Sequence, residues 1–205
     1  MTTEMTTQPA RQQRADAKRN IERLLEAARA AIAKDGPEAS LDDIARDAGV
    51  GSGTLYRHFP TRVALLEAVY RSEVERICAE GDRLLDSGTE PGEALSEWLR
   101  AYVSFGAVKR GLMGPLTTAL GQDSDLFASC KAMVKATGGR LVERAQDAGS
   151  IRKDVEITDV LTLASAIAHA GELTREGSDL SARLLAVAID GLRADRGGSA
   201  TTDRP

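Results

Sequence analysis

The sequence predicts an all-α protein, on three observations. Alanine and leucine dominate the apolar positions, and aromatic residues make up only 3% of the 205 residues. Apolar residues recur three and four positions apart, as on one face of an α-helix, in one stretch after another. Residues that start and stop helices separate these stretches. We find no convincing strand and no internal repeat.

The composition is that of an ordinary globular protein. A hydrophobic fraction of 42% supplies a core, and 205 residues suit one or two small domains. No apolar run approaches the roughly 20 residues that cross a bilayer. The segment before residue 15 lacks the apolar stretch of a signal peptide. We therefore expect a cytoplasmic protein with no membrane partner.

The first helix is expected over residues 20–34, after a disordered N-terminal arm over residues 1–15. The helix ends at Gly36 and Pro37. Its apolar stripe consists of Ile21, Leu24, Leu25, Ala28, Ala31 and Ile32. Four cations lead into it, namely Arg11, Arg14, Lys18 and Arg19. This basic lead-in either contacts DNA phosphates or a minor groove, or is a solvated tail.

A short second helix is expected to begin at Leu41. Ser40 is a good N-cap, and Asp43 three positions later suits the positive end of the helix dipole. Gly49 stands where a helix C-cap needs a left-handed residue, and Val50 can bury in the corner that follows.

A third helix is expected to open at Gly51 or Ser52 and to stop at Pro60, before Thr61 N-caps the next. Leu55 and Phe59, four apart, share an apolar face that can pack on the second helix. The opposite face is small or hydrogen-bonding and consists of Ser52, Gly53, Thr54, Tyr56, Arg57 and His58. Residues 40–59 therefore have the build of a helix-turn-helix that places one helix in a DNA major groove.

Residues 18–70 resemble the DNA-binding motif of the tetracycline-repressor-like (TetR) family of regulators. The matching positions are Gly36, Ser40-Leu41, Ile44-Ala45, Ala48-Gly49-Val50, Thr54-Leu55-Tyr56, His58-Phe59 and the cation Arg62. The chain departs from the family at Pro60-Thr61, where an Asn or a Ser-Lys pair is common. The segment from Trp98 to Gly111 resembles the SbtR-like subgroup of actinobacterial regulators.

The expected DNA-binding domain spans residues 16–62. Thr54 and Tyr56 are the best candidates for base contact, with Ser52, Gly53 and Arg57 close behind. Phosphate contacts are expected from Tyr56, His58, Arg62 and the backbone amides near Ser40. For His58, a hydrogen bond within the protein is the alternative.

The net charge of -4 does not argue against a DNA partner, because its distribution is uneven. The first 62 residues hold 10 Lys and Arg against 9 Asp and Glu. The remaining residues hold 17 against 22, so the acidic excess lies outside the expected DNA-binding domain.

The rest of the chain, residues 63–195, is expected to be a helical regulatory domain, followed by a disordered tail over residues 196–205. Its helices are expected at residues 62–85, 93–109, a short one around 116 after a break at 111–115, then 124–146, 158–174 and 181–194. The last helix is apolar on more than one face. We expect the last two helices to form a four-helix homodimer interface through Ile167, Gly171, Leu184, Val187, Ala188 and Leu192; a role in the intrachain core alone is the alternative.

The family resemblance implies a helical cup for a small-molecule effector. Candidate lining residues are Trp98, Tyr102, Phe105, Met113, Leu116, Phe127, Cys130, Met133 and His169. For each of them, a place in the ordinary core is the alternative, and His169 is more often structural in such a setting. Trp98 and Tyr102, one turn apart, form the best pair because each has a polar group that can orient a ligand.

Other function classes find little support. The isolated Cys78 and Cys130 make no CxxC motif, and the chain has no HExxH and no glycine-rich phosphate loop. We therefore expect no enzyme activity, no metal and no cofactor. The expected function is a dimeric regulator of transcription, a repressor released from a palindromic double-stranded DNA operator by an effector. The alternative is a helical adaptor that binds only protein.

Overall fold

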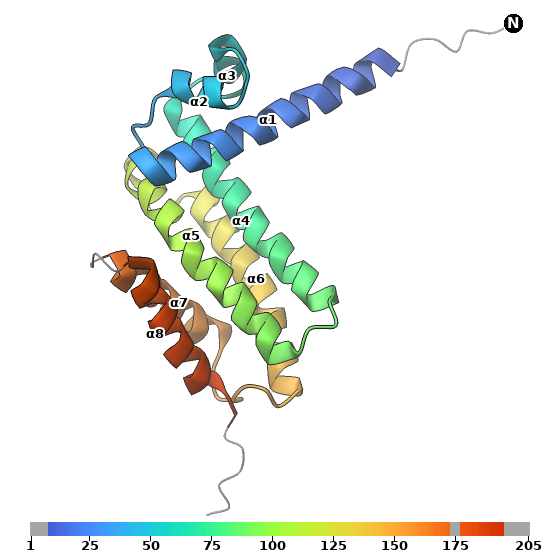
Figure 1. Ribbon diagram of the computed structural model, residues 1–205, viewed down its shortest axis with the longest axis vertical. Helices are drawn as coiled ribbons and strands as arrows, with labels where there is room; N and C mark the ends of the chain where they lie inside the picture. The colour runs from blue at the N-terminus through green and yellow to red at the C-terminus, as the bar shows by residue number, and fades with distance from the viewer. Residues whose placement is uncertain (1–7, 173–176, 195–205) are drawn as a thin grey trace, which may run out of the picture. The chain divides into compact units, whose positions relative to one another are not determined.

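The computed structural model describes residues 8–172 and 177–194 (Figure 1). Over these residues the chain is helical, with no strand longer than an isolated bridge, which confirms the all-α class. The helices are α1 (Gln8–Asp35), α2 (Leu41–Asp47), α3 (Ser52–His58), α4 (Arg62–Asp86), α5 (Pro91–Leu120), α6 (Asp125–Asp147), α7 (Ile157–Glu172) and α8 (Gly177–Leu192).

Helix α1 begins at Gln8 rather than near residue 20. The expectation of a disordered arm was therefore wrong for residues 8–15, while residues 1–7 lie outside the described part. Alanine, glutamine and arginine dominate residues 10–15, and all three favour helix. Pro9 lies in the first turn, where its missing N–H removes no helical hydrogen bond.

Helix α5 is continuous through residues 111–115, where a break was expected. A Cβ added at Gly111 would lie 3.0 Å from Cγ2 of Ile32. The glycine therefore permits a close approach of α5 to α1 rather than ending the helix. Pro115 lies within the last turns of α5, so few helical residues follow the position where a proline removes a backbone donor.

The other helices lie within a few residues of their expected bounds, although α8 begins at Gly177 rather than near 181 and ends at Leu192. The expected tail, residues 196–205, lies outside the described residues. Among the described helices, none has the length and hydropathy that crossing a membrane would require. Within the same residues, no three His, Cys, Asp or Glu side chains are grouped as metal ligands.

The chain divides into two compact units. The first comprises residues up to Glu73 together with Val108–Phe127, and the second comprises Val74–Ala107 and the residues from Ala128 on. The units therefore do not divide after residue 62, because the long helices α4 and α5 each contribute to both. The functional division into residues 16–62 and 63–195 remains a prediction.

The core of the first unit is aliphatic. Its completely or almost completely buried side chains include Leu24, Ala28, Ile44, Ala45, Leu55, Leu65, Leu66, Leu112 and Leu116. Glu73 is buried among them, and Nε of Arg29 lies 3.6 Å from its carboxylate. A charge partner offsets part of the cost of burying this carboxylate.

The core of the second unit is built around Trp98. Its ring is fully buried, and its Nε1–H donates a hydrogen bond of 3.1 Å to the carbonyl oxygen of Ile77 on α4. Gly138 on α6 allows the ring to pack closely, since an added Cβ would lie 2.5 Å from Cη2 of Trp98. Arg144 on α6 donates to the carbonyl oxygens of Leu84 and Leu85 at 3.0 and 2.8 Å, which satisfies the C-terminal end of α4.

Candidate nucleic-acid interface and regulatory surfaces

The turn between α2 and α3 has the geometry expected from its sequence. The backbone N–H of Asp43 donates to Oγ of Ser40 at 3.3 Å, so Ser40 is the N-cap of α2. Gly49 has a φ of +65°, and the N–H of Val50 donates to the carbonyl oxygen of Ala45 at 3.0 Å. These bonds end α2 and fix the direction in which the chain enters α3.

Two contacts set the orientation of α3. Leu55 is completely buried and Phe59 is buried to more than nine-tenths, so the apolar side of α3 faces the core of the first unit. The hydroxyl of Ser52 donates a hydrogen bond of 2.7 Å to Oδ1 of Asp42, which joins the first turn of α3 to α2. This burial is consistent with the expectation that Leu55 and Phe59 pack α3 against α2.

The opposite side of α3 is open to solvent. Tyr56 is 47% exposed, which is high for so large a side chain, and Gly53 and Arg57 are exposed as well. Ser52, Thr54 and His58 are half-buried. We call the six residues 52–54 and 56–58 the outward face of α3. It combines one aromatic hydroxyl and one guanidinium with small residues, which lets the helix backbone come close to a base edge.

Arg62, whose phosphate contact remains a prediction, makes contacts within the protein. Its Nη1 donates to the carbonyl oxygens of Pro37 and Ala39 at 2.9 and 2.7 Å, and its Nε lies 3.9 Å from a carboxylate oxygen of Glu38. The side chain thus ties the start of α4 to the loop before α2. Ser40, the other predicted residue near this loop, is exposed and serves as the N-cap.

His58 lies beside the buried Phe59, with ring centroids 6.4 Å apart and planes inclined by 53°. This position is compatible with either role that the sequence left open for it. The phosphate contact and the helix-packing hydrogen bond therefore both remain predictions.

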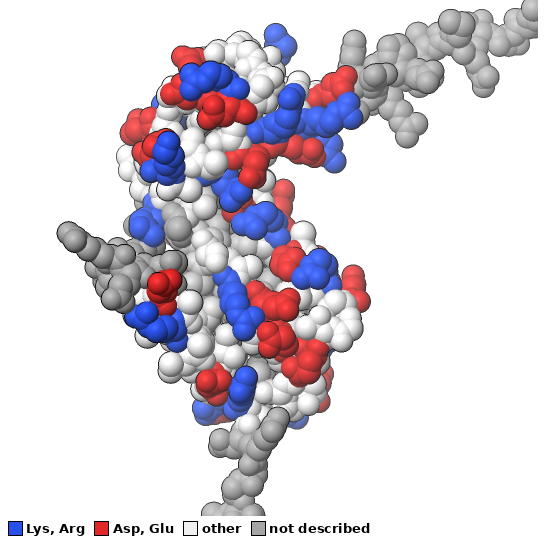
Figure 2. Space-filling model, viewed as in Figure 1, with Lys and Arg blue, Asp and Glu red and all other residues white. Residues whose placement is uncertain are grey.

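The charge around α3 is mixed. In Figure 2, Lys and Arg side chains on the first unit alternate with Asp and Glu. On α1, Arg19 pairs with Asp16, and Nζ of Lys18 lies 3.9 Å from Oε1 of Glu22. The basic lead-in is therefore less positive than its count of cations indicates.

The predicted effector residues are divided between the two units. Met113, Leu116 and Phe127 belong to the first unit, and the other six belong to the second. Phe127 makes an edge-to-face contact with Tyr70, with ring centroids 5.7 Å apart. His169 is exposed, whereas Phe105 and Cys130 are buried.

The pair Trp98 and Tyr102 is stacked, with ring centroids 5.9 Å apart, but its polar groups already have partners. The indole N–H of Trp98 binds the carbonyl of Ile77, and the hydroxyl of Tyr102 lies 3.1 Å from Oγ of Ser165 on α7. Trp98 thus serves the core, which is the alternative that the sequence left open. Met133 is half-buried on α6.

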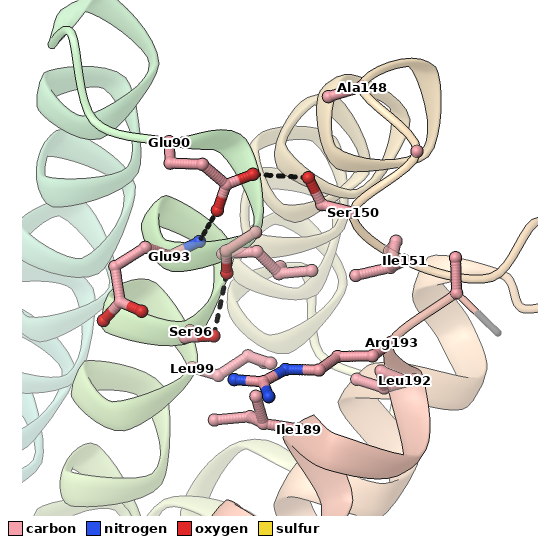
Figure 3. A pocket seen from close by; sticks show the side chains of 14 residues that line it. Glu90, Glu93, Ser96, Leu99, Ala148, Ser150, Ile151, Ile189, Leu192 and Arg193 are labelled. Atoms are coloured by element: carbon pink, nitrogen blue, oxygen red, sulfur yellow. Dashed lines mark hydrogen bonds between the residues drawn. The ribbon is translucent and has the colours of Figure 1, made fainter. Parts of the chain in front are cut away.

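A cavity of about 710 Å³ lies elsewhere in the second unit (Figure 3). It is bounded by the start of α5, the turn at residues 148–151 and the end of α8, and none of the nine predicted residues lines it. The sequence predicts helix ends near these segments, after residues 85 and 146, but nothing in it indicates that the segments meet. The pairing of segments about 60 and 100 residues apart is a tertiary feature without a local pattern.

The helices predicted to form a dimer, α7 and α8, lie side by side in the second unit (Figure 1). Of the six predicted interface residues, Ile167, Gly171 and Leu192 are buried within the chain, which favours for these three the intrachain core that the sequence left open as the alternative. One side of α7 faces α5, since a Cβ added at Gly106 would lie 2.6 Å from Cβ of Ala168.

Helices α7 and α8 also carry apolar side chains that are exposed to solvent. Val187 on α8 is 71% exposed and Leu163 on α7 is 43% exposed, with the exposed alanines Ala166 and Ala186 on the same two helices. Leu184 and Ala188 are half-buried. We call Leu163, Ala166, Ala186 and Val187 the outer α7–α8 surface; of these, only Val187 was among the predicted interface residues.

Two stretches of the chain match family models. Residues 24–69 match the model described as bacterial regulatory proteins of the tetR family. Residues 90–194 match the model of the transcriptional regulator SbtR-like C-terminal domain. The two stretches include the helix-turn-helix and nearly all of the expected regulatory helices.

Solved structures and curated relatives agree with these matches. A TetR transcriptional regulator from Streptomyces coelicolor is 36% identical, with a TM-score of 0.77 over 85% of this chain and 99% of that chain. A TetR transcription regulatory protein from Mycobacterium vanbaalenii is 38% identical, with a TM-score of 0.71 over 88% of this chain and 99% of that chain. The transcriptional repressor KstR of Mycolicibacterium smegmatis is 35% identical over 112 residues, 54% of this chain and 52% of that protein. The chain thus spans about half the length of the curated relatives it matches.

Proposed function

We propose that this chain, which belongs to the TetR family of bacterial regulatory proteins, is a DNA-binding regulator of transcription and acts as a homodimeric repressor. The observation that supports this proposal most directly is the outward face of α3. Leu55 is completely buried while Tyr56 beside it is 47% exposed, so α3 presents its hydrogen-bonding side to solvent.

On this proposal, the outward face of α3 reads bases in a major groove. Thr54 and Tyr56 contact base edges or a thymine methyl, and Gly53 lets the helix approach closely. Arg57 is a further candidate for base contact, and His58 contacts a phosphate and fixes the position of the helix along the duplex. The helix is short, so few base pairs are read by each protomer.

A second copy of the chain supplies the second recognition helix. We propose that the outer α7–α8 surface forms the dimer interface, because its exposed leucine and valine are accompanied by alanines that permit close packing of helices. Two recognition helices roughly 34 Å apart match successive major grooves on one face of the duplex. The operator is then a near-palindrome.

Repression and release by an effector complete the proposal. The relative KstR is named a transcriptional repressor, which supports repression as the mode of action here. A small molecule bound in the regulatory domain would change the spacing of the two recognition helices and release the DNA. Since the proposed target is double-stranded DNA, the protein would act in the cytoplasm.

Selection of binding sites from a pool of random double-stranded DNA tests the proposal. The full chain should enrich a near-palindrome whose half-sites are centred about one helical turn, roughly 10 base pairs, or two turns apart. Enrichment of no sequence would contradict the proposal and favour a protein-binding adaptor. Enrichment of a single half-site without its repeat would contradict the dimeric part alone.

A further inference from the structure

The cavity of about 710 Å³ in the second unit has an apolar floor and charged edges (Figure 3). Leu95 and Leu99 on α5 and Leu192 on α8 are almost fully buried and supply the floor, together with Ile151. Ile189 is half-buried beside them. The volume falls in the range of about 300–1,000 Å³ that is common for small-molecule sites, and the lining also includes polar groups.

Arg193 is fixed at one edge of this cavity. It forms an antiparallel bridge with Ile151, in which the N–H of Arg152 donates to the carbonyl of Leu192 at 2.8 Å. Residues directly opposite in such a bridge project to the same side. Ile151 is part of the floor, so the side chain of Arg193 lies on the side of the cavity. Figure 3 shows the Arg193 side chain above Ile189 and directed toward Leu99.

The guanidinium of Arg193 has donors to spare. The guanidinium pairs with Asp190 one turn earlier on α8, with Nη1 and Oδ1 3.3 Å apart and both side chains more than two-thirds exposed. Such exposed pairs within a helix contribute little to stability. A carboxylate that accepts two parallel N–H bonds from the guanidinium would bind more strongly.

Glu90 supplies a negative charge at another edge of the cavity. Its carboxylate accepts hydrogen bonds from the hydroxyl of Ser150 and, at 3.0 Å, from the backbone N–H of Glu93. The Ser150 hydrogen bond lowers the pKa of Glu90, with backbone bonds from Gly92 and Glu93 adding to the effect, so the group is ionised at neutral pH. The second acid, Glu93, pairs with Arg100 at 3.1 Å.

We propose that this cavity binds a small zwitterion with an apolar body, the chemistry of a short hydrophobic peptide. Its carboxylate would bind Arg193, its ammonium group would bind Glu90, and its apolar side chains would cover Leu95, Leu99 and Ile189. With Glu90 and Glu93 at one edge and Arg193 beside Asp190 at another, the lining carries charges of both signs, so a ligand with both charges can pair with each edge.

The regulatory meaning of this site rests on the proposed function, since a peptide bound here would be an effector of DNA binding. The binding itself does not require DNA and can be measured on the free protein. Failure of the two proposals is therefore distinguishable: a chain that selects an operator but binds no peptide contradicts only the site described here.

Titration calorimetry of the full chain with L-leucyl-L-leucine tests the ligand class. Two blocked forms are matched controls, because N-acetyl-leucyl-leucine lacks the ammonium group and leucyl-leucine amide lacks the carboxylate. We expect the free dipeptide to bind and each blocked form to bind at least about tenfold more weakly, as for loss of a charge-assisted hydrogen bond. Equal binding of a blocked form, or no binding of the dipeptide up to millimolar concentration, would overturn the proposal.

Substitutions locate the binding. Arg193→Gln should weaken binding of the dipeptide about tenfold or more. Arg152→Gln, which removes an exposed ion pair with Asp154, should leave the affinity unchanged. Ile189→Trp fills the floor and should abolish binding while the far-ultraviolet circular dichroism stays helical. Unchanged affinity in both Arg193→Gln and Ile189→Trp would place the peptide elsewhere and overturn the assignment.

Discussion

Nη1 of Arg62, at the start of α4, lies 2.7 Å from the carbonyl oxygen of Ala39, immediately before the N-cap of α2. A second bond of 2.9 Å reaches the carbonyl of Pro37. One side chain therefore fixes the loop that sets where α2 begins. A residue at a position that resembles a phosphate contact in the family motif thus has a structural role in the free protein.

Arg62→Ala should lower the free energy of unfolding by about 1–3 kcal/mol, because it removes two charge-assisted hydrogen bonds to partly buried carbonyls. Urea denaturation followed by circular dichroism measures this change. Arg57→Ala is the control, since Arg57 is exposed on α3 and its loss should change stability by about 0.5 kcal/mol or less. An Arg62→Ala protein of unaltered stability, with only a smaller salt dependence of DNA binding, would contradict this structural role and favour the phosphate contact.

Gly49→Ala should destabilise the protein by about 1–2 kcal/mol, since Gly49 adopts a φ of +65° at the end of α2. The nearest side-chain atom to an added Cβ is 3.5 Å away, so the cost would come from the backbone conformation and not from a clash. Gly53→Ala is the matched variant, because Gly53 lies in α3 with open space around it. It should raise stability by up to about 1 kcal/mol while weakening operator binding. Equal stability of the two variants in urea would contradict the C-cap assignment.

Gly138→Ala should destabilise the second unit by about 1–3 kcal/mol through overpacking. The new methyl would lie 2.5 Å from the Trp98 ring and 2.6 Å from Cδ1 of Ile157. Trp98 is the only tryptophan of the chain, so its fluorescence during thermal unfolding reports on this site directly. Gly139→Ala, at the next position with nothing within 4 Å of an added Cβ, should not destabilise. A loss of stability in both variants would show that the effect is not specific to the Trp98 contact.

Val187→Asp should convert the protein to monomers. Val187 is 71% exposed on the outer α7–α8 surface, and an aspartate there would be buried without a partner in a dimer. Light scattering coupled to size-exclusion chromatography measures the mass. Ala128→Asp, on the exposed side of α6, should keep the dimer mass. If the wild-type chain is already monomeric at micromolar concentration, the dimer proposal fails outright.

Local signals in the sequence predicted the DNA-binding part well. Ser40, Gly49 and Thr61 each have a capping geometry that depends on neighbours within four residues, and the structure confirms all three. The burial of Leu55 and Phe59 followed from their helical spacing. Such features can be predicted because the physical cause and the residue lie within one or two turns of each other.

Long-range features could not be predicted in the same way. Gly111 looked like a helix break, but its role is contact with Ile32 about 80 residues earlier in the chain. Likewise, the aromatic pair Trp98 and Tyr102 has its polar groups satisfied by residues on α4 and α7. A polar group on an apolar helix face looks available for a ligand in the sequence whether or not the fold supplies a partner.

The salt dependence of operator binding, measured by fluorescence anisotropy for the wild-type chain and for Tyr56→Ala, tests the central proposal most directly. The DNA is the site enriched from the random pool, or the chain's own upstream region. We expect wild-type affinity to fall steeply as salt rises, in proportion to the phosphates contacted. Tyr56→Ala should bind about tenfold or more weakly with a nearly unchanged unfolding temperature, since Tyr56 is 47% exposed on the outward face of α3. A folded Tyr56→Ala protein that binds the same DNA with wild-type affinity would contradict DNA reading by the outward face of α3.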